Sequence, residues 1–172
     1  MLHIVQAAVV AVFPALVIVA ALRDAVSYRI PNWISLALIA GFAVAAPLLG
    51  LSLQDIGIHV GIGAAALVIG FLMFTFRWIG GGDAKLFAVA ALWLGWPAVF
   101  TYAITTTIAG GVLAVSLLAL RSPYLRPFVV TAPAWLGRLA EPGEAVPYGL
   151  AIAVGALAAF PESPLMKPFL GI

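Results

Sequence analysis

The chain has 172 residues, of which 65% are hydrophobic and 8% are charged. A soluble domain carries about 25% charged residues to cover its surface, so this composition excludes a soluble protein and predicts an integral membrane protein in contact with the lipid bilayer. The formal net charge of +2 is too small to suggest nucleic-acid binding, and a chain with no cysteine has no disulfide, no thiolate metal site and no cysteine nucleophile.

The first apolar run, from Ile4 to Leu22, predicts a transmembrane helix. It is about as long as a bilayer-spanning helix, roughly 20 residues. No arginine or lysine precedes it, because the first arginine, Arg23, follows the run. We therefore interpret it as a retained span rather than a cleaved signal peptide.

Further apolar runs cover residues 33–51, 56–76, 86–120 and 146–160. The run 86–120 is too long for one span, since a helix rises about 1.5 Å per residue and the hydrocarbon core is about 30 Å thick. Gly95-Trp96-Pro97 is the natural break, because proline removes a backbone donor and disfavours helical angles in the residue before it. The predicted fold is an all-α integral membrane protein, a six-transmembrane-helix bundle in one domain over residues 1–172. The predicted spans are residues 4–22, 33–51, 56–76, 83–95, 98–120 and 146–160.

The basic residues predict the orientation of this bundle, because they collect in cytoplasmic loops. One side holds only Lys167, and the other side holds Arg23, Arg29, Arg77, Lys85, Arg121, Arg126 and Arg138. We therefore expect both termini outside. The loop 121–145 is predicted to be an irregular cytoplasmic segment with aromatic anchors, and its prolines are Pro123, Pro127, Pro133 and Pro142.

Two aspartates, Asp24 and Asp83, lie at the edges of apolar runs. Ionisable groups near membrane depth are costly and are candidates for function. The alternative for Asp24 is a solvated boundary charge paired with arginine. The alternative for Asp83 is an N-cap at the positive end of a helix.

Three glycines, Gly80, Gly81 and Gly82, directly precede Asp83, which is more than a cap requires. Without side chains they let another backbone approach the carboxylate. The predicted topology places both carboxylates on the cytoplasmic side. If the first and fourth helices pack together, the carboxylates can share a water. One ionised aspartate would then act as base while the protonated one donates to a carbonyl. Arg23 and Lys85 would oppose this by favouring the charged forms.

Two further motifs have plain structural interpretations. Pro31 and Asn32 suit the start of the second span. Pro147-Tyr148-Gly149 opens the sixth span, either as a helix start with an interfacial tyrosine or as a backbone wall of an active site. His3 and His59 fall on the outer side, where we expect interfacial or core positions. We expect Glu141 and Glu144 to be solvated.

These motifs are Asp24 with Ile30-Pro31-Asn32, then Gly80-Gly81-Gly82-Asp83-Ala84-Lys85-Leu86, then Pro147-Tyr148-Gly149. In order and spacing the chain resembles the type IV prepilin peptidases, GxGD-type membrane aspartyl proteases with six spans and a cytoplasm-facing active site. The resemblance implies that Asp24 and Asp83 are the catalytic pair. It implies supporting roles for Gly80, Gly81, Gly82, Lys85, Pro31, Asn32, Pro147, Tyr148 and Gly149.

The resemblance also implies the reaction and the substrate. The short basic leader of a prepilin or pseudopilin precursor would be cut after a glycine, just before the precursor's hydrophobic helix. Neither a metal nor another cofactor would take part. The location would be the cytoplasmic membrane of a bacterium or archaeon. The sequence does not determine the oligomeric state.

The long forms of this family also N-methylate the new terminus, using a cysteine-containing insert between the first two spans. This chain has only a short connection there and no cysteine. It therefore looks like the short form that serves Flp-type (tight-adherence) pili, with peptidase activity and no methylation.

Three alternatives remain open at the sequence level. The first is a small proton- or cation-coupled transporter, which predicts carboxylates deep within helices and broken helices near the midplane. The second is a presenilin-like protease, although such proteins place tyrosine where this chain has Arg23. The third is a structural subunit of a membrane complex, which leaves the three glycines unexplained.

Overall fold

The computed structural model describes residues 1–125, 134–141 and 143–170. Within these ranges every regular element is helical, so the prediction of an all-α protein is confirmed. The main helices are α1 (Leu2–Ser27), α2 (Asn32–Leu48), α3 (Leu53–Thr75), α4 (Gly81–Leu94), α5 (Ala98–Leu120), α7 (Ala134–Leu139) and α8 (Tyr148–Ala159). The described C-terminal region consists of the 3-10 turns η1 (Phe160–Glu162) and η2 (Pro164–Met166) and the short α9 (Lys167–Leu170).

Three of these helices are long and apolar enough to cross a membrane. They are α1 from His3, α3 and α5. Helices α2 and α8 are apolar but shorter, and α4 has 14 residues. The structure therefore supports an integral membrane protein, whereas the number of six complete crossings and the orientation remain predictions.

The helix boundaries follow local backbone chemistry rather than the limits of the apolar runs. Helix α5 covers the predicted residues 98–120, and the break before it falls at Gly95, whose φ of 63° is left-handed. Helix α1 continues past the predicted end at residue 22. It stops where Tyr28 turns to φ 52° and donates its N–H to the carbonyl oxygen of Asp24. Asp24 therefore lies in the last turn of α1.

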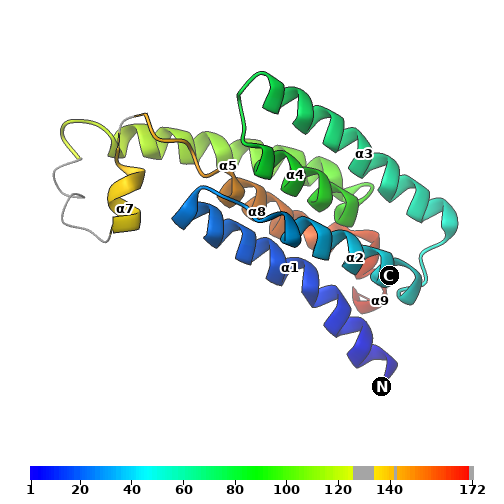
Figure 1. Ribbon diagram of the computed structural model, residues 1–172. Coiled ribbons are helices and arrows are strands. Elements are labelled where there is room, and N and C mark those ends of the chain that lie inside the picture. The colour runs from blue at the N-terminus through cyan, green and yellow to red at the C-terminus, as the bar shows by residue number, and fades with distance from the viewer. Residues whose placement is uncertain (126–133, 142, 171–172) are drawn as a thin grey trace.

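The six longest helices run alternately in opposite directions along one bundle (Figure 1). Helix α3 packs against α4, and α8 packs against α1, α5 and α4. The N-terminus and α9 lie at the end of the bundle opposite α7 (Figure 1). The connections α1–α2, α3–α4 and α5–α8 therefore lie at the α7 end of the bundle.

An aromatic cluster forms the core between α1 and α4. Trp93 is fully buried and stacks on Phe13, with ring centroids 5.2 Å apart. Its Nε1–H donates to the carbonyl oxygen of Leu38 at 2.8 Å. His59 is buried beside this cluster, and its Nδ1 lies 2.7 Å from the carbonyl oxygen of Leu92. The expectation that His59 is a core or interfacial residue is confirmed.

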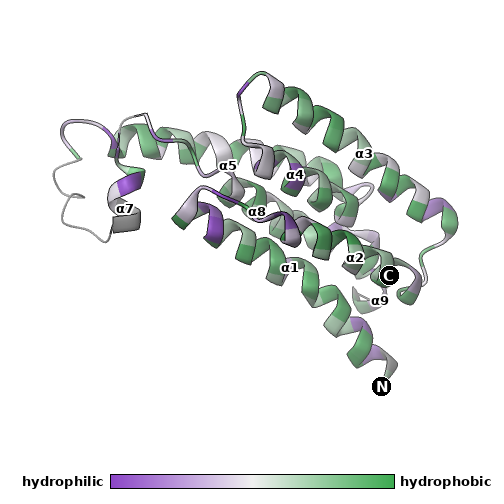
Figure 2. Cartoon of the chain, in the orientation of Figure 1, coloured by the Kyte–Doolittle hydropathy of each residue, from purple (hydrophilic) through white to green (hydrophobic). Residues whose placement is uncertain are grey.

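The outer surfaces of the long helices are apolar. Large hydrophobic side chains of α3 and α5, such as Val68, Phe71, Val115 and Leu118, are more than half exposed. Figure 2 shows hydrophobic residues along most of these helices and polar stretches at the C-terminal end of α1 and in α7. Such a surface suits lipid rather than water.

The loop 121–145 is only partly irregular, because it contains the helix α7. That prediction is corrected to this extent. Residues 126–133 and 142, which include Arg126, Pro127, Phe128, Pro133 and Pro142, lie outside the described residues.

Candidate active site

Asp24 is buried at the α7 end of the bundle, with 4% of its surface exposed. Its Oδ2 accepts a 2.8 Å hydrogen bond from the backbone N–H of Gly149, in the first turn of α8. Among the described residues, the one ion pair within 4 Å joins Arg138 to Glu144. The alternative of a solvated boundary charge paired with arginine is therefore wrong for Asp24.

Asp83 is also buried, with 8% of its surface exposed. The N-cap of α4 is Gly80, and Asp83 occupies the third helical position. Its Oδ2 accepts a 3.1 Å hydrogen bond from the backbone N–H of Gly80. The alternative that Asp83 is the N-cap is therefore wrong, because the N-cap lies three residues earlier. The Asp83 side chain instead bonds back to the cap residue, as the acidic member of a capping box does.

The two aspartates line the same two cavities. The first cavity, of about 480 Å³, is bounded by Tyr28, by the connection 29–32 and by Gly80–Gly82. The second, of about 390 Å³, is bounded by Tyr28, Phe74, residues 77–80, Ala145, Val146 and Tyr148. The fold thus brings together two carboxylates that are far apart in the sequence. Helix α8 contributes to this, because it packs on both α1 and α4.

Two glycines permit this close packing. A Cβ on Gly149 would lie 2.8 Å from Oδ2 of Asp24 and 2.9 Å from the Cβ of Asp24. A Cβ on Gly82 would lie 3.2 Å from the Cβ of Ile30. At Gly82 another segment does approach closely, because the backbone of Ile30 lies against this glycine; that the glycines serve the carboxylate stays a prediction. Real Cβ atoms essentially never come within 3.0 Å of such a neighbour, so a side chain at Gly149 would force the elements apart. The 3.2 Å contact at Gly82 is tighter than most real Cβ contacts, so a side chain there would require Ile30 to shift by a few tenths of an ångström.

The Pro147-Tyr148-Gly149 motif is a helix start, and its backbone also contacts Asp24. Helix α8 begins at Tyr148, with Pro147 as its N-cap. The N–H of Gly149 donates to Asp24, and a role of this backbone as the wall of an active site stays a prediction. Tyr148 lines the second cavity, whereas Pro147 and Gly149 line neither cavity.

Pro31 and Asn32 begin the second helix as expected. Pro31 is the N-cap of α2, and both residues line the first cavity. The amide oxygen of Asn32 accepts a 2.9 Å hydrogen bond from Nζ of Lys85. Lys85 therefore contacts Asn32, lines neither cavity and makes no ion pair with a described carboxylate.

Tyr28 is a site residue to which the sequence assigned no role. It lines both cavities and adopts left-handed backbone angles that non-glycine residues seldom occupy. Its hydroxyl is buried without a hydrogen-bond partner among the described residues. Burial raises the pKa of the phenol, so the hydroxyl stays protonated. The sequence signal was its position four residues after Asp24, on the same face of the helix end.

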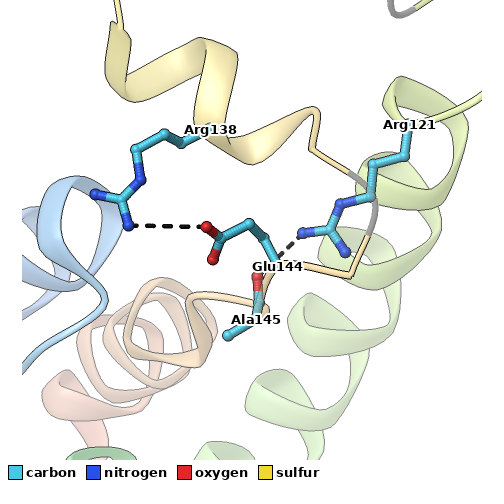
Figure 3. Close-up of polar contacts among 4 residues, drawn as sticks. All are labelled: Arg121, Arg138, Glu144 and Ala145. Carbon is cyan, nitrogen blue, oxygen red and sulfur yellow. Dashed lines mark hydrogen bonds and ion pairs between the residues drawn. The ribbon is translucent and has the colours of Figure 1, made fainter.

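Two arginines contact the segment 144–146, of which Ala145 and Val146 line the second cavity. The guanidinium of Arg138 lies 5.2 Å from the ring centroid of Tyr28 and pairs with Glu144 at 3.9 Å. Arg121 donates to the carbonyl oxygens of Leu139 at 3.0 Å and Ala145 at 3.1 Å. Figure 3 shows the two arginines approaching this segment from either side. Glu144, expected to be solvated, is instead paired and about one-third exposed.

The geometry bears on the remaining alternatives. Both carboxylates lie in terminal turns, of α1 and α4, rather than in the middle of broken helices, which disfavours a transporter. Among the described residues, no group of three or more His, Cys, Asp or Glu side chains is arranged to hold a metal ion. Paired buried carboxylates beside a cavity can activate water against a carbonyl.

Comparison with known proteins gives one match. The family model described as the type IV leader peptidase family matches residues 11–115, which is more than half of the chain. The matched range contains Asp24 and Asp83 but ends before Gly149. No curated protein and no solved structure matches the chain.

Proposed function

Because this chain belongs to the type IV leader peptidase family, we propose that it is an aspartic endopeptidase in which Asp24 and Asp83 are the catalytic pair. The family is one of membrane peptidases that act on prepilins. The observation that carries the proposal is the burial of both carboxylates against the same two cavities. No other aspartate or glutamate lines either cavity.

The reaction requires the two carboxylates in different protonation states. Two neighbouring carboxylates cannot both ionise easily, so the pair shares one proton. The ionised aspartate takes a proton from water, whose oxygen attacks the scissile carbonyl carbon. The protonated aspartate donates its proton to the carbonyl oxygen, which gives a tetrahedral diol. Collapse of the diol transfers a proton to the amide nitrogen and breaks the C–N bond.

The backbone donors keep the carboxylates in position during these steps. The N–H of Gly149 holds one oxygen of Asp24, and the N–H of Gly80 holds one oxygen of Asp83. The second oxygen of each carboxylate accepts no hydrogen bond from the residues that the structure describes, which leaves it for water or substrate. Holding reacting groups in a productive geometry contributes strongly to rate enhancement.

The distribution of basic residues supports the proposed side of the membrane, and the length of the α1–α2 connection supports the proposed subtype. Six of the basic residues, Arg23, Arg29, Arg77, Lys85, Arg121 and Arg138, lie at the aspartate end of the bundle, which supports a cytoplasmic active site. Only residues 28–31 separate α1 from α2. This short connection and the lack of cysteine support a short-form peptidase without N-methylation. The Flp-type precursors and the removal of a basic leader after a glycine are what the resemblance to that short form implies.

Substitution of each aspartate tests the proposal. Asp24→Asn and Asp83→Asn each keep the size of the side chain and remove the acid, so cleavage of a co-expressed prepilin should fall at least 1,000-fold while membrane insertion persists. Asp55→Asn is the matched control, because Asp55 lies in the exposed capping box that begins α3. Full processing by either active-site variant would overturn the catalytic assignment.

A further inference from the structure

We propose that an apolar groove between α2 and α3 binds the apolar helical segment that flanks the scissile bond of the substrate. The inference rests on the proposed function and deepens it. The groove has a volume of about 940 Å³, and α4 forms its floor. Its walls and floor include Leu36, Ile39, Ala43, Val60, Ala64 and Val89.

The groove opens beside the two aspartates. Asn32 lines both the groove and the first aspartate cavity, and Lys85, its hydrogen-bond partner, also lines the groove. Ser35 is the remaining polar lining residue and lies one helical turn further along α2. Beyond this end the lining is apolar, so a chain leaving the aspartates along the groove passes from a polar mouth into an apolar channel.

The length of the groove fits a helix. Its lining on α2 extends from Asn32 to Pro47, roughly 20 Å at 1.5 Å per residue. A segment within lipid must satisfy its own backbone hydrogen bonds, which an α-helix does. Small, exposed residues at Ala43 and Ala64 leave room for a close helix approach, as in other membrane helix pairs.

Continuity with the aspartate cavity favours the substrate over other occupants. Lipid acyl chains could cover the apolar walls, but they do not require an opening at the catalytic carboxylates. A substrate requires such an opening, because its scissile bond must lie at Asp24 and Asp83 while the adjoining apolar segment lies in the groove. Asn32 lines both the first cavity and the groove, so the scissile bond can lie in the cavity while the apolar segment lies in the groove.

Disulfide trapping tests this directly, because the chain contains no cysteine. Ala64→Cys and Ala65→Cys would each be made in the inactive Asp83→Asn protein. Both residues are exposed neighbours on α3, but only Ala64 lines the groove. Single cysteines would be placed at successive positions of the precursor's apolar segment. We expect adducts with Ala64→Cys, repeating every three to four precursor positions, and few with Ala65→Cys.

Filling the groove provides the activity test. Ala64→Trp should lower cleavage of the membrane-embedded precursor at least tenfold, whereas Ala65→Trp should leave it unchanged. A short soluble peptide that spans the scissile bond but lacks the apolar segment should be cleaved equally by both variants. This peptide also reports whether the active site of Ala64→Trp is intact.

The outcomes separate the groove from the catalytic assignment. Absence of adducts at Ala64, together with normal precursor cleavage by Ala64→Trp, would leave lipid as the occupant and overturn the inference. Disulfide-linked peptidase dimers through Ala64→Cys would instead make the groove an interface between copies. Neither result touches the proposed function, which fails only if the Asp24→Asn or Asp83→Asn protein still cleaves.

Discussion

The backbone N–H of Gly149 and the carboxylate of Asp24 are joined by a 2.8 Å hydrogen bond across 125 positions of sequence. The bond links the first turn of α8 to the last turn of α1. It places a helix N-terminus against a buried acid, which is a favourable location for negative charge. Helix α8, the last of the six long helices, is therefore part of the candidate active site.

Gly149→Ala should strongly reduce peptidase activity. The added Cβ would lie 2.8 Å from Oδ2 of Asp24, so either α8 or the carboxylate must move. A displacement of about 1 Å at a catalytic group costs on the order of 100-fold in rate. Initial rates of precursor cleavage by purified protein measure this effect. Gly111→Ala is the control, because a Cβ there meets nothing within 4 Å. Equal activity of the two variants would contradict the role of the Gly149 contact.

Tyr28→Phe should leave stability unchanged or slightly higher. The hydroxyl is buried and has no hydrogen-bond partner among the described residues, so its removal loses no described bond. The ring remains beneath the guanidinium of Arg138. Thermal unfolding in detergent should show a change within about 0.5 kcal/mol. Tyr102→Phe is the comparison, because the Tyr102 hydroxyl donates to the carbonyl oxygen of Phe87 and its loss should destabilise the protein. A marked loss of stability in Tyr28→Phe would show that the hydroxyl does have a partner.

Arg121→Ala should weaken the attachment of residues 139–146, of which Ala145 and Val146 line the second cavity. The guanidinium donates to the carbonyl oxygens of Leu139 and Ala145, and hydrogen bonds from a charged group contribute about 1.5–3 kcal/mol each when buried and less when exposed. Limited proteolysis should therefore cut residues 134–146 faster in this variant. The control is Arg23→Ala, since Arg23 is exposed and makes no described side-chain contact. Identical proteolysis patterns in the two variants would show that the hydrogen bonds of Arg121 do not hold this segment in place.

Trp93→Phe should destabilise the bundle without changing the chemistry. The substitution removes the hydrogen bond to the carbonyl oxygen of Leu38 and part of a fully buried ring, at a cost of about 1–3 kcal/mol. The unfolding midpoint in detergent should fall, while cleavage per folded molecule stays near its original value. Trp78→Phe provides the control, because Trp78 is 68% exposed. A fall in the specific activity of folded Trp93→Phe would instead connect the aromatic core to catalysis.

The sequence by itself determined the helical elements and the candidate acids. Apolar runs predict spans because the free energy of transfer from water to lipid adds up over consecutive residues, so it can be read from the sequence. The prediction placed α5 at its observed bounds and the break at Gly95-Trp96-Pro97. The scarcity of charge singled out Asp24 and Asp83, and the alternation of spans placed them at one end of the bundle.

Only the tertiary structure decided how these parts meet. The rotation of α8 about its axis places the Gly149 N–H on Asp24, and the separation of α3 from α2 creates the groove that begins at Asn32. The position of Tyr28 between both cavities, with its ring beneath the guanidinium of Arg138 in α7, is likewise a tertiary feature. Hydropathy reports whether a residue prefers lipid or water, but not which neighbour it faces. That choice comes from the packing of whole helices, to which residues far apart in sequence contribute together.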